Sequence, residues 1–217
     1  MLRLEIPRRP KKALRILCLG AHSDDIEIGC GGTLLHLLEG GAVEIDWVVF
    51  SGSPVRAREA RTSARRLARG SRSLRIVTKR FRDGFFPSQA TRIKEEFERL
   101  KRGPSPDVVF CPWRGDAHQD HRLLSELTGN TFRDHLVLEY EIPKYDGDLG
   151  SPNLYVPLAE ETVRRKVEHL MGAFPSQAGN QWFDREAFRA ILRLRGIESN
   201  SPSRFAEGFY CRKASLL

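Results

Sequence analysis

The sequence predicts an α/β fold in which a Rossmann-like, mostly parallel sheet is flanked by helices, with a small C-terminal α+β extension. Short apolar runs alternate with helix-like segments along the first two thirds of the chain, a pattern typical of a parallel sheet covered on both faces. Polar, ionisable residues directly follow two of the apolar runs, where open parallel sheets bind their ligands. After residue 142 the alternation loosens, which indicates an extension to the sheet domain.

Five strands joined by four helices are expected before residue 143. The predicted strands are 13–20, 42–52, 74–81, 107–113 and 135–142, and the predicted helices are 31–41, 55–69, 88–102 and 120–128. The first helix ends on paired glycines, a common helix stop. The cluster Gly29, Gly31 and Gly32 is expected to let a loop turn beneath the site and lead into this helix near residue 33.

The C-terminal third is expected to shape the substrate pocket. Its turn-rich segment 143–152 predicts a surface loop, and the patterns that follow predict strands at 153–157 and 205–213 and helices near 160–172 and 184–195. Because 217 residues rarely need more than one core, a single domain is expected, with its core over 13–142 and the substrate-shaping part over 143–217.

Composition excludes several classes of protein. No run approaches the roughly 18 uninterrupted apolar residues that would span a bilayer, and the basic N-terminus has no small-residue cleavage site. A cytoplasmic location is therefore expected. The four cysteines include no CxxC pair, so neither a thiolate zinc site nor a disulfide framework is predicted.

The net charge of +8 raises the question of a nucleic-acid partner. Much of the excess lies on a predicted helix, where Arg58, Arg61, Arg65 and Arg69 recur at helical spacing. A solvated helix face explains this row, and no zinc finger, RNP-type pattern or helix-turn-helix accompanies it. No nucleic acid is expected, although a basic nucleic-acid-binding protein remains the alternative from a different functional class.

Two loops bear the candidate chemistry. AHSDD (21–25) follows the first predicted strand, and PWRGDAHQDHR (112–122) follows the fourth. Since both lie past the carboxyl ends of strands, they are expected to converge and to offer two histidines and a carboxylate to one metal ion. Dinucleotide binding fits poorly, because GxGxxG would have to follow the strand directly, whereas the glycine cluster comes about nine residues later.

AHSDD and the HQDH within the second loop resemble the AHPDD and HxDH signatures of the PIG-L/LmbE-like zinc-dependent deacetylases. That family removes acetyl groups from N-acetylglucosamine attached to inositol, malate, lipid or glycopeptide. FPSQ (174–177) and RFAEGFY (204–210) are similar to one of its subgroups. Ser23 and Gln119 stand where prolines are common in the family, which is expected to alter loop stiffness without removing a ligand or base.

The resemblance implies that His22, Asp25 and His121 are the metal ligands. Three N/O ligands and an open position make a catalytic zinc site, and a donor set without sulfur would also accept Fe²⁺. Adjacent carboxylates cannot easily aim at one point, so Asp24 is expected to face the reacting water as the general base.

The resemblance also assigns His118 to stabilising the oxyanion and protonating the departing amine. Asp120 is expected to hold the imidazole of His118 in its tautomer and to favour its charged form. Arg56, in RARE (56–59), and Asp83, in FRDGFF, are the implied sugar-binding residues.

The implied function is metal-dependent removal of the N-acetyl group from a small molecule or glycoconjugate bearing N-acetylglucosamine. The alternative within the enzymes is an amidase that removes a longer acyl chain from an amino sugar. Neither the aglycone nor the oligomeric state is indicated by any pattern in the sequence.

Overall fold

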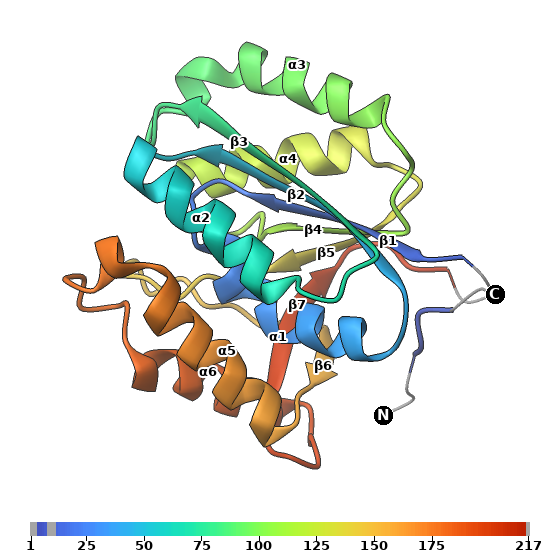
Figure 1. Cartoon of the computed structure of the whole chain (residues 1–217), viewed down its shortest axis with the longest axis vertical. Helices are drawn as coiled ribbons and strands as arrows, with labels where there is room; N and C mark the ends of the chain where they lie inside the picture. The colour runs from blue at the N-terminus through green and yellow to red at the C-terminus, as the bar shows by residue number, and fades with distance from the viewer. Residues whose placement is uncertain (1–3, 8–11, 216–217) are drawn as a thin grey trace.

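The computed structural model describes residues 4–7 and 12–215, so part of the basic N-terminus considered above lies outside the described residues. Within them one seven-stranded sheet has the order β3-β2-β1-β4-β5-β7-β6 (Figure 1). The strands are β1 (Leu14–Gly20), β2 (Val43–Ser51), β3 (Ser73–Phe81), β4 (Val108–Pro112), β5 (Leu136–Tyr140), β6 (Leu154–Pro157) and β7 (Ala206–Cys211). The first five are parallel, and β7 is antiparallel to both β5 and β6. The predicted fold class is confirmed. The two strands of the C-terminal extension, β6 and β7, add to one edge of the same sheet.

Helices cover both faces of the sheet. They are α1 (Asp25–Glu39), α2 (Pro54–Leu67), α3 (Ala90–Lys101), α4 (Gln119–Thr131), α5 (Glu160–Ala173) and α6 (Arg185–Glu198), with short 3₁₀ turns at Pro87–Gln89 and Pro175–Gln177. One face packs against α1 and α2, and the other against α3 and α4 (Figure 1). Beyond the first face, α5 contacts α1 and α2, and α6 contacts α5 and β7.

The first helix begins earlier than predicted. It starts at Asp25, so Gly29, Gly31 and Gly32 lie inside α1 and form no loop. Close packing explains them: a Cβ on Gly29 would lie 2.1 Å from Cδ2 of Tyr140, and one on Gly32 would lie 2.5 Å from Leu158. These glycines let α1 approach the sheet, a tertiary demand that outweighs their low helix propensity.

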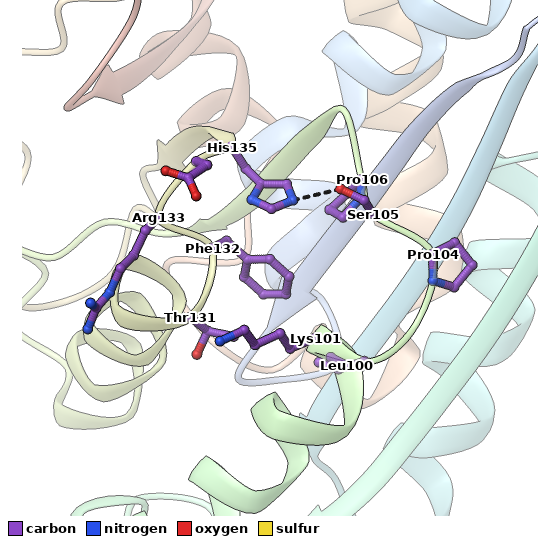
Figure 2. Close-up of a pocket in the computed structure, with 10 residues that line it drawn as sticks. Leu100, Lys101, Pro104, Ser105, Pro106, Thr131, Phe132, Arg133 and His135 are labelled. Atoms are coloured by element: carbon purple, nitrogen blue, oxygen red, sulfur yellow. Dashed lines mark hydrogen bonds between the residues drawn. The ribbon is translucent and has the colours of Figure 1, made fainter.

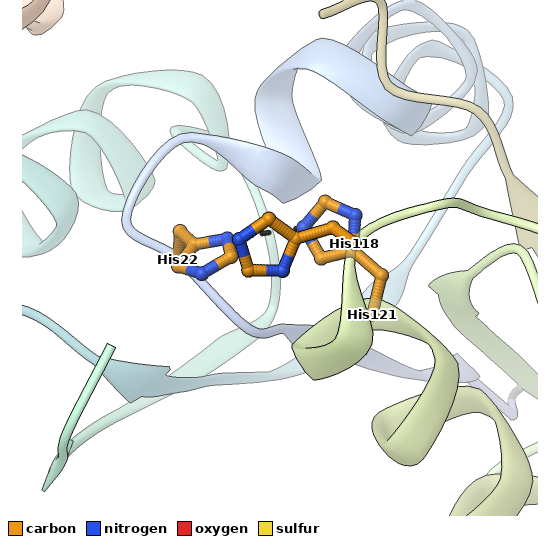
Figure 3. Close-up of side chains that lie close together, drawn as sticks. All are labelled: His22, His118 and His121. Atoms are coloured by element: carbon orange, nitrogen blue, oxygen red, sulfur yellow. Dashed lines mark hydrogen bonds between the residues drawn. The ribbon is translucent and has the colours of Figure 1, made fainter. Parts of the chain in front are cut away.

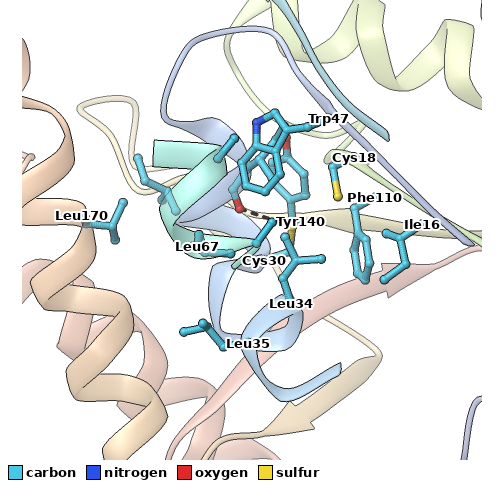
Figure 4. Packing of buried hydrophobic residues seen from close by; sticks show 14 of the residues in the cluster. Ile16, Cys18, Cys30, Leu34, Leu35, Trp47, Leu67, Phe110, Tyr140 and Leu170 are labelled. Atoms are coloured by element: carbon cyan, nitrogen blue, oxygen red, sulfur yellow. Dashed lines mark hydrogen bonds between the residues drawn. The ribbon is translucent and has the colours of Figure 1, made fainter. Parts of the chain in front are cut away.

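Tyr140 is the largest side chain in this contact. It is fully buried, and its hydroxyl donates a 2.6 Å hydrogen bond to the carbonyl of Leu19 in β1. Figure 4 shows it packed among core residues that include Cys18, Cys30 and Trp47. The position of Tyr140 is therefore set by the hydrogen bond of its hydroxyl and by the packing of its ring.

Gly29→Ala is expected to lower the free energy of unfolding by about 1–3 kcal/mol, the usual cost of overpacking a dense core. The new methyl group would overlap the ring of Tyr140, which has no free space to enter. Chemical denaturation checks this. Gly172→Ala in α5 is the matched control, because its Cβ meets no atom within 4 Å and the change is expected to leave stability equal or slightly higher. Equal stability of the Gly29 and Gly172 variants would contradict the packing argument.

A buried ion pair from the C-terminal third holds α1. Lys166 of α5 lies 2.6 Å from Glu207 of β7, and both side chains are almost completely buried. The carboxylate of Glu207 accepts from the backbone N–H groups of Gly32 and Thr33, while Lys166 donates to the carbonyl of Ile28. Removal of either partner would leave an uncompensated buried charge, so both residues are expected to be needed for α1 to stay in this position.

A second polar cluster joins α1, α2 and α5. The hydroxyl of Ser63 lies 2.7 Å from Nε2 of His169 and within hydrogen-bonding distance of Glu27. Burial raises the pKa of Glu27, whose residue is fully buried. Burial, assisted by the nearby Arg66, lowers the pKa of His169 to about 4. His169 is therefore neutral at pH 7 in the folded protein.

His169 is expected to make the protein less stable as the pH falls from about 6.5 to about 4. Over this range the unfolded chain binds a proton that folded His169 resists, so the contribution is complete above pH 6.5 and lost below pH 4. The loss should be about 1–3 kcal/mol, because a shift of one pKa unit is worth ~1.4 kcal/mol and His169 is partly exposed. Comparing denaturation midpoints at the two pH values, His169→Gln should show a flatter dependence than wild type, while the exposed-site variant His36→Gln should match wild type. Parallel curves for all three proteins would argue against this role.

Within the described residues, no helix is long and apolar enough to cross a membrane. The four cysteines, all of which fall in that part of the chain, are free thiols, in agreement with the absence of a predicted disulfide framework.

Candidate functional site

The site lies where the strand order reverses. From the neighbouring central strands β1 and β4, the chain runs outward to β2 and β3 on one side and to β5 on the other. In open parallel sheets the loops that follow two such strands diverge and leave a crevice. His22 follows β1, and His121 lies in the first turn of α4 after β4, so the topology brings the two predicted motifs to one place.

The three residues expected to be ligands converge. His22 Nδ1 lies 3.0 Å from His121 Nε2. The carboxylate of Asp25 approaches both rings, with one oxygen 3.5 Å from His22 Nδ1 and the other 3.4 Å from His121 Nε2. All three residues are buried. These separations are of the size expected for atoms that share one ion at bonds of about 2.0–2.2 Å.

A third imidazole completes the cluster in Figure 3. His118 is the N-cap of α4, and its ring centroid lies 4.7 Å from that of His22 and 4.9 Å from that of His121. Nitrogen atoms of the three histidines all lie within 4.8 Å of one another. Nδ1 of His118 accepts a 3.2 Å hydrogen bond from the backbone N–H of Asp120, so a neutral ring has its proton on Nε2.

Burial and neighbouring charges both shift the pKa values of the groups in this cluster. Burial alone would lower the pKa of His22 and of His121, but Asp25 and other carboxylates raise both. Burial would raise the pKa of Asp25, and the two histidines instead hold it well below its usual range. Burial lowers the pKa of His118, and the charges of His22 and His121 lower it further. Such opposed shifts in a few neighbouring groups are characteristic of functional sites.

Asp24 faces a different partner from Asp25. One of its oxygens accepts a 2.7 Å hydrogen bond from Arg56, and the other is buried and has no hydrogen-bonding partner among the described residues. Burial raises the pKa of Asp24, although Arg56 opposes this. Arg56 follows β2 at the start of α2, so the residue expected to bind sugar holds the expected base in place. A buried oxygen without a partner is a place where a reactant proton can be received.

Asp83 lies at the mouth of the site. One of its oxygens is 3.0 Å from Nε2 of His22, the other is 4.0 Å from Arg56, and the side chain is 55% exposed. Its contact with His22 lowers its pKa. The exposure leaves Asp83 accessible to a ligand from solvent.

The expected contact between the Asp120 carboxylate and the His118 ring is wrong. The two oxygens of Asp120 accept from the backbone N–H groups of Gly84 and Phe86, at 2.7 and 3.0 Å. The same carboxylate lies 3.5 Å from Nε2 of His22. Because residue 120 is in the first turn of α4, its carboxylate is turned toward the loop after β3, and the His118 ring is hydrogen-bonded by its backbone N–H. Although burial lowers the pKa of His118 overall, the charge of Asp120 still acts to raise this pKa, in the expected direction.

Two residues beside His121 were not predicted. Asp116 is 2% exposed, and its Oδ2 lies 2.9 Å from Nδ1 of His121. Lys144, from the segment after β5, is 2.9 Å from the same oxygen. Asp116 is visible in the sequence as the acid two residues before His118. Nothing in the sequence brings Lys144, 28 residues downstream, to this point.

The donor set suits a divalent ion of zinc or iron type. It offers imidazole nitrogens and a carboxylate without sulfur, and a histidine pair in direct contact is an arrangement that a cation would relieve. His22, Asp25 and His121 have side-chain atoms within 3.5 Å of one another, and His118 is near enough to the two histidines to be a further ligand. Asp83 and Asp120 form a second such group with His22 and His118, with donor atoms within 4.8 Å. Asp24 Oδ2, buried without a partner, adds an orphaned acceptor beside them.

A cavity of about 280 Å³ lies elsewhere (Figure 2). Its lining comes from residues 100–106 and 131–135, which precede β4 and β5, so it opens at the amino ends of the strands. Ser105 and His135 contact each other there at 3.0 Å. It lacks the paired carboxylates and imidazoles of the other edge, and we place the chemistry at the carboxyl ends.

Comparison with known proteins agrees with the two motifs. A profile of the PIG-L family, described as GlcNAc-PI de-N-acetylase, matches residues 17–132. A conserved protein from Thermus thermophilus is 23% identical, with 94% of this chain and 97% of that chain covered and a TM-score of 0.72. The N,N'-diacetylchitobiose deacetylase from Pyrococcus horikoshii is 24% identical, with 92% and 84% covered and a TM-score of 0.69. The 4-carboxy-2-hydroxymuconate hydratase GalB from Pseudomonas putida is 16% identical, with 94% and 98% covered and a TM-score of 0.68. These structures show the shared fold, which by itself does not determine a reaction.

Proposed function

Because the chain belongs to the PIG-L family of GlcNAc-PI de-N-acetylases, we propose that it removes the N-acetyl group from an amino sugar of the N-acetylglucosamine type. The observation that supports this most is the convergence of His22, Asp25 and His121, with the unpartnered oxygen of Asp24 beside them. Amide hydrolysis needs an activated water, a proton acceptor and a stabiliser of the oxyanion, and this cluster offers a group for each.

His22, Asp25 and His121 would hold the metal ion, Zn²⁺ in the first instance and Fe²⁺ as the alternative. Such an ion supplies a Lewis acid for the acetyl carbonyl and lowers the pKa of water at its open position. Asp24 accepts the proton of the attacking water, and Arg56 keeps the carboxylate oriented while it does so.

His118 donates a hydrogen bond from Nε2 to the oxyanion as it forms, because Nδ1 is already occupied by the N–H of Asp120. A single donor of this kind typically contributes ~100- to 1,000-fold to the rate. The proton held on Asp24 then passes to the sugar nitrogen, in place of the His118 proton that the resemblance implied, the C–N bond breaks, and acetate and the free amine are released. Asp83, exposed at the mouth, would bind a sugar hydroxyl.

The proposal is tested by incubating the purified protein with a series of N-acetylglucosaminides that differ in aglycone, in the presence of Zn²⁺ or, without oxygen, of Fe²⁺. Equimolar acetate and free amine are expected, and a chelator should abolish both. N-propionyl and N-butyryl analogues in the same series separate acetyl removal from the longer-acyl alternative. If no amino sugar releases an acid, the proposal is overturned.

A nucleic-acid partner is a second candidate, favoured by one observation. Arg58, Arg65 and Arg69 are exposed on and just after α2, and the described residues include no acidic partner for them. Fluorescence anisotropy with single- and double-stranded oligonucleotides tests this reading. Binding that weakens steeply as salt is raised would favour it, and no binding at low salt would remove it.

A further inference from the structure

We propose that Asp116 is a positioning residue for His121, and that Lys144 from the segment after β5 keeps Asp116 in this role. The inference rests on the proposed function, since it concerns the imidazole expected to bind the metal ion. It goes further by assigning a role to a carboxylate and a lysine that lie outside the two sequence signatures.

The contacts of Asp116 account for both of its oxygens. Oδ1 accepts a 2.8 Å hydrogen bond from the backbone N–H of His118. Oδ2 lies 2.9 Å from His121 Nδ1 and 2.9 Å from Lys144 Nζ, although it sits off the direction of the N–H of the ring. Asp116 therefore contacts both His118, the residue proposed to stabilise the oxyanion, and His121, the proposed metal ligand.

The choice of ring nitrogen depends on this contact. An imidazole whose Nδ1–H faces a carboxylate has its lone pair on Nε2, and Nε2 of His121 is the atom that faces His22 and Asp25. Carboxylates behind metal-binding histidines fix the tautomer and raise the basicity of the ligand nitrogen.

Lys144 connects this pair to the rest of its segment. Its ammonium lies 2.6 Å from Asp148 and also donates to the carbonyl of Ile142. Asp148 in turn accepts a 2.5 Å hydrogen bond from the backbone N–H of Ala117, next to Asp116. Two acids share one largely buried lysine, so the segment 142–148 and the loop 116–118 are joined as one charged network. The loop expected to shape the substrate pocket thus also supports the ligand side of the site.

The test measures metal affinity directly, by competition with a chromogenic chelator, and records the visible spectrum of the Co²⁺-loaded protein. Asp116→Asn keeps the shape and removes the charge, and it should weaken Zn²⁺ binding by about 10- to 100-fold and shift the Co²⁺ bands. Asp146→Asn is the matched control, because Asp146 is an exposed aspartate of the same segment. It should bind like wild type.

Lys144→Met should weaken binding less than Asp116→Asn, Lys144→Arg should recover part of the loss, and the double variant should bind no more weakly than Asp116→Asn alone. If Asp116→Asn does not fold, as judged by its thermal melt, the Lys144 pair provides the same comparison. Metal affinity within twofold of wild type for both Asp116→Asn and Lys144→Met would overturn the inference while leaving the proposed function intact. Failure of the wild type to bind metal would overturn the proposed function and the inference with it.

Discussion

Asp24→Asn is expected to lower kcat by about 100- to 10,000-fold, the range that general acid–base groups contribute, while metal affinity stays close to that of wild type. The change keeps an oxygen that can accept from Arg56, so the buried guanidinium contact survives. It removes the carboxylate that would take the proton of water. The measurement pairs steady-state kcat on the best N-acetyl amino sugar with the metal content of the same sample.

Gln119→Asn is a suitable control for this variant, since it alters a polar side chain near the site whose amide donates to the backbone carbonyl of Gly84. Its turnover should remain within a few-fold of wild type. An Asp24→Asn protein that keeps a tenth or more of wild-type kcat would show that another group receives the proton.

Asp25→Ala, unlike Asp24→Asn, is expected to lose metal binding. Metal affinity should fall by more than about 100-fold, beyond what loss of an outer partner usually costs, and activity should fall with it. Asp25 contributes the carboxylate that approaches both His22 and His121, and it also accepts from the backbone N–H of His22. Metal content after dialysis and chelator competition provide the readouts.

Excess metal should restore part of the activity of Asp25→Ala but none of that of Asp24→Asn. The two adjacent aspartates therefore form an internal control for each other, because both are buried and both stand at the start of the same helix. A metal-free Asp24 variant together with a fully loaded Asp25 variant would exchange their roles.

Much of the fold could be predicted because apolar runs and helical patterns alternate clearly. The start of α1 could not, since three glycines within four positions weaken any helical signal. Their purpose becomes visible only when Tyr140 and Glu207, distant in sequence, are seen against the helix. These tertiary contacts keep the glycines helical, although their low helix propensity predicts a loop there.

The candidate site, too, could be predicted only in part from the sequence. His22, Asp25 and His121 could be brought together in advance, because parallel strands place their following loops at one edge. The partner of Asp120 could not, because residue spacing does not say whether a side chain at the start of a helix turns toward its neighbour or toward another loop. Lys144 reaches the site from beyond an intervening strand, and no short motif marks it.

The ion pair between Lys166 and Glu207 has a consequence for how this protein can be divided. Helix α1 begins with Asp25, yet its middle is bonded to α5 and to the last strand of the described chain. A fragment that stops at residue 132, where the family profile ends, would retain both histidine motifs but leave that helix without its anchors. We expect such a truncated chain to be inactive, because the helix that carries Asp25 would lose its contacts with α5 and β7.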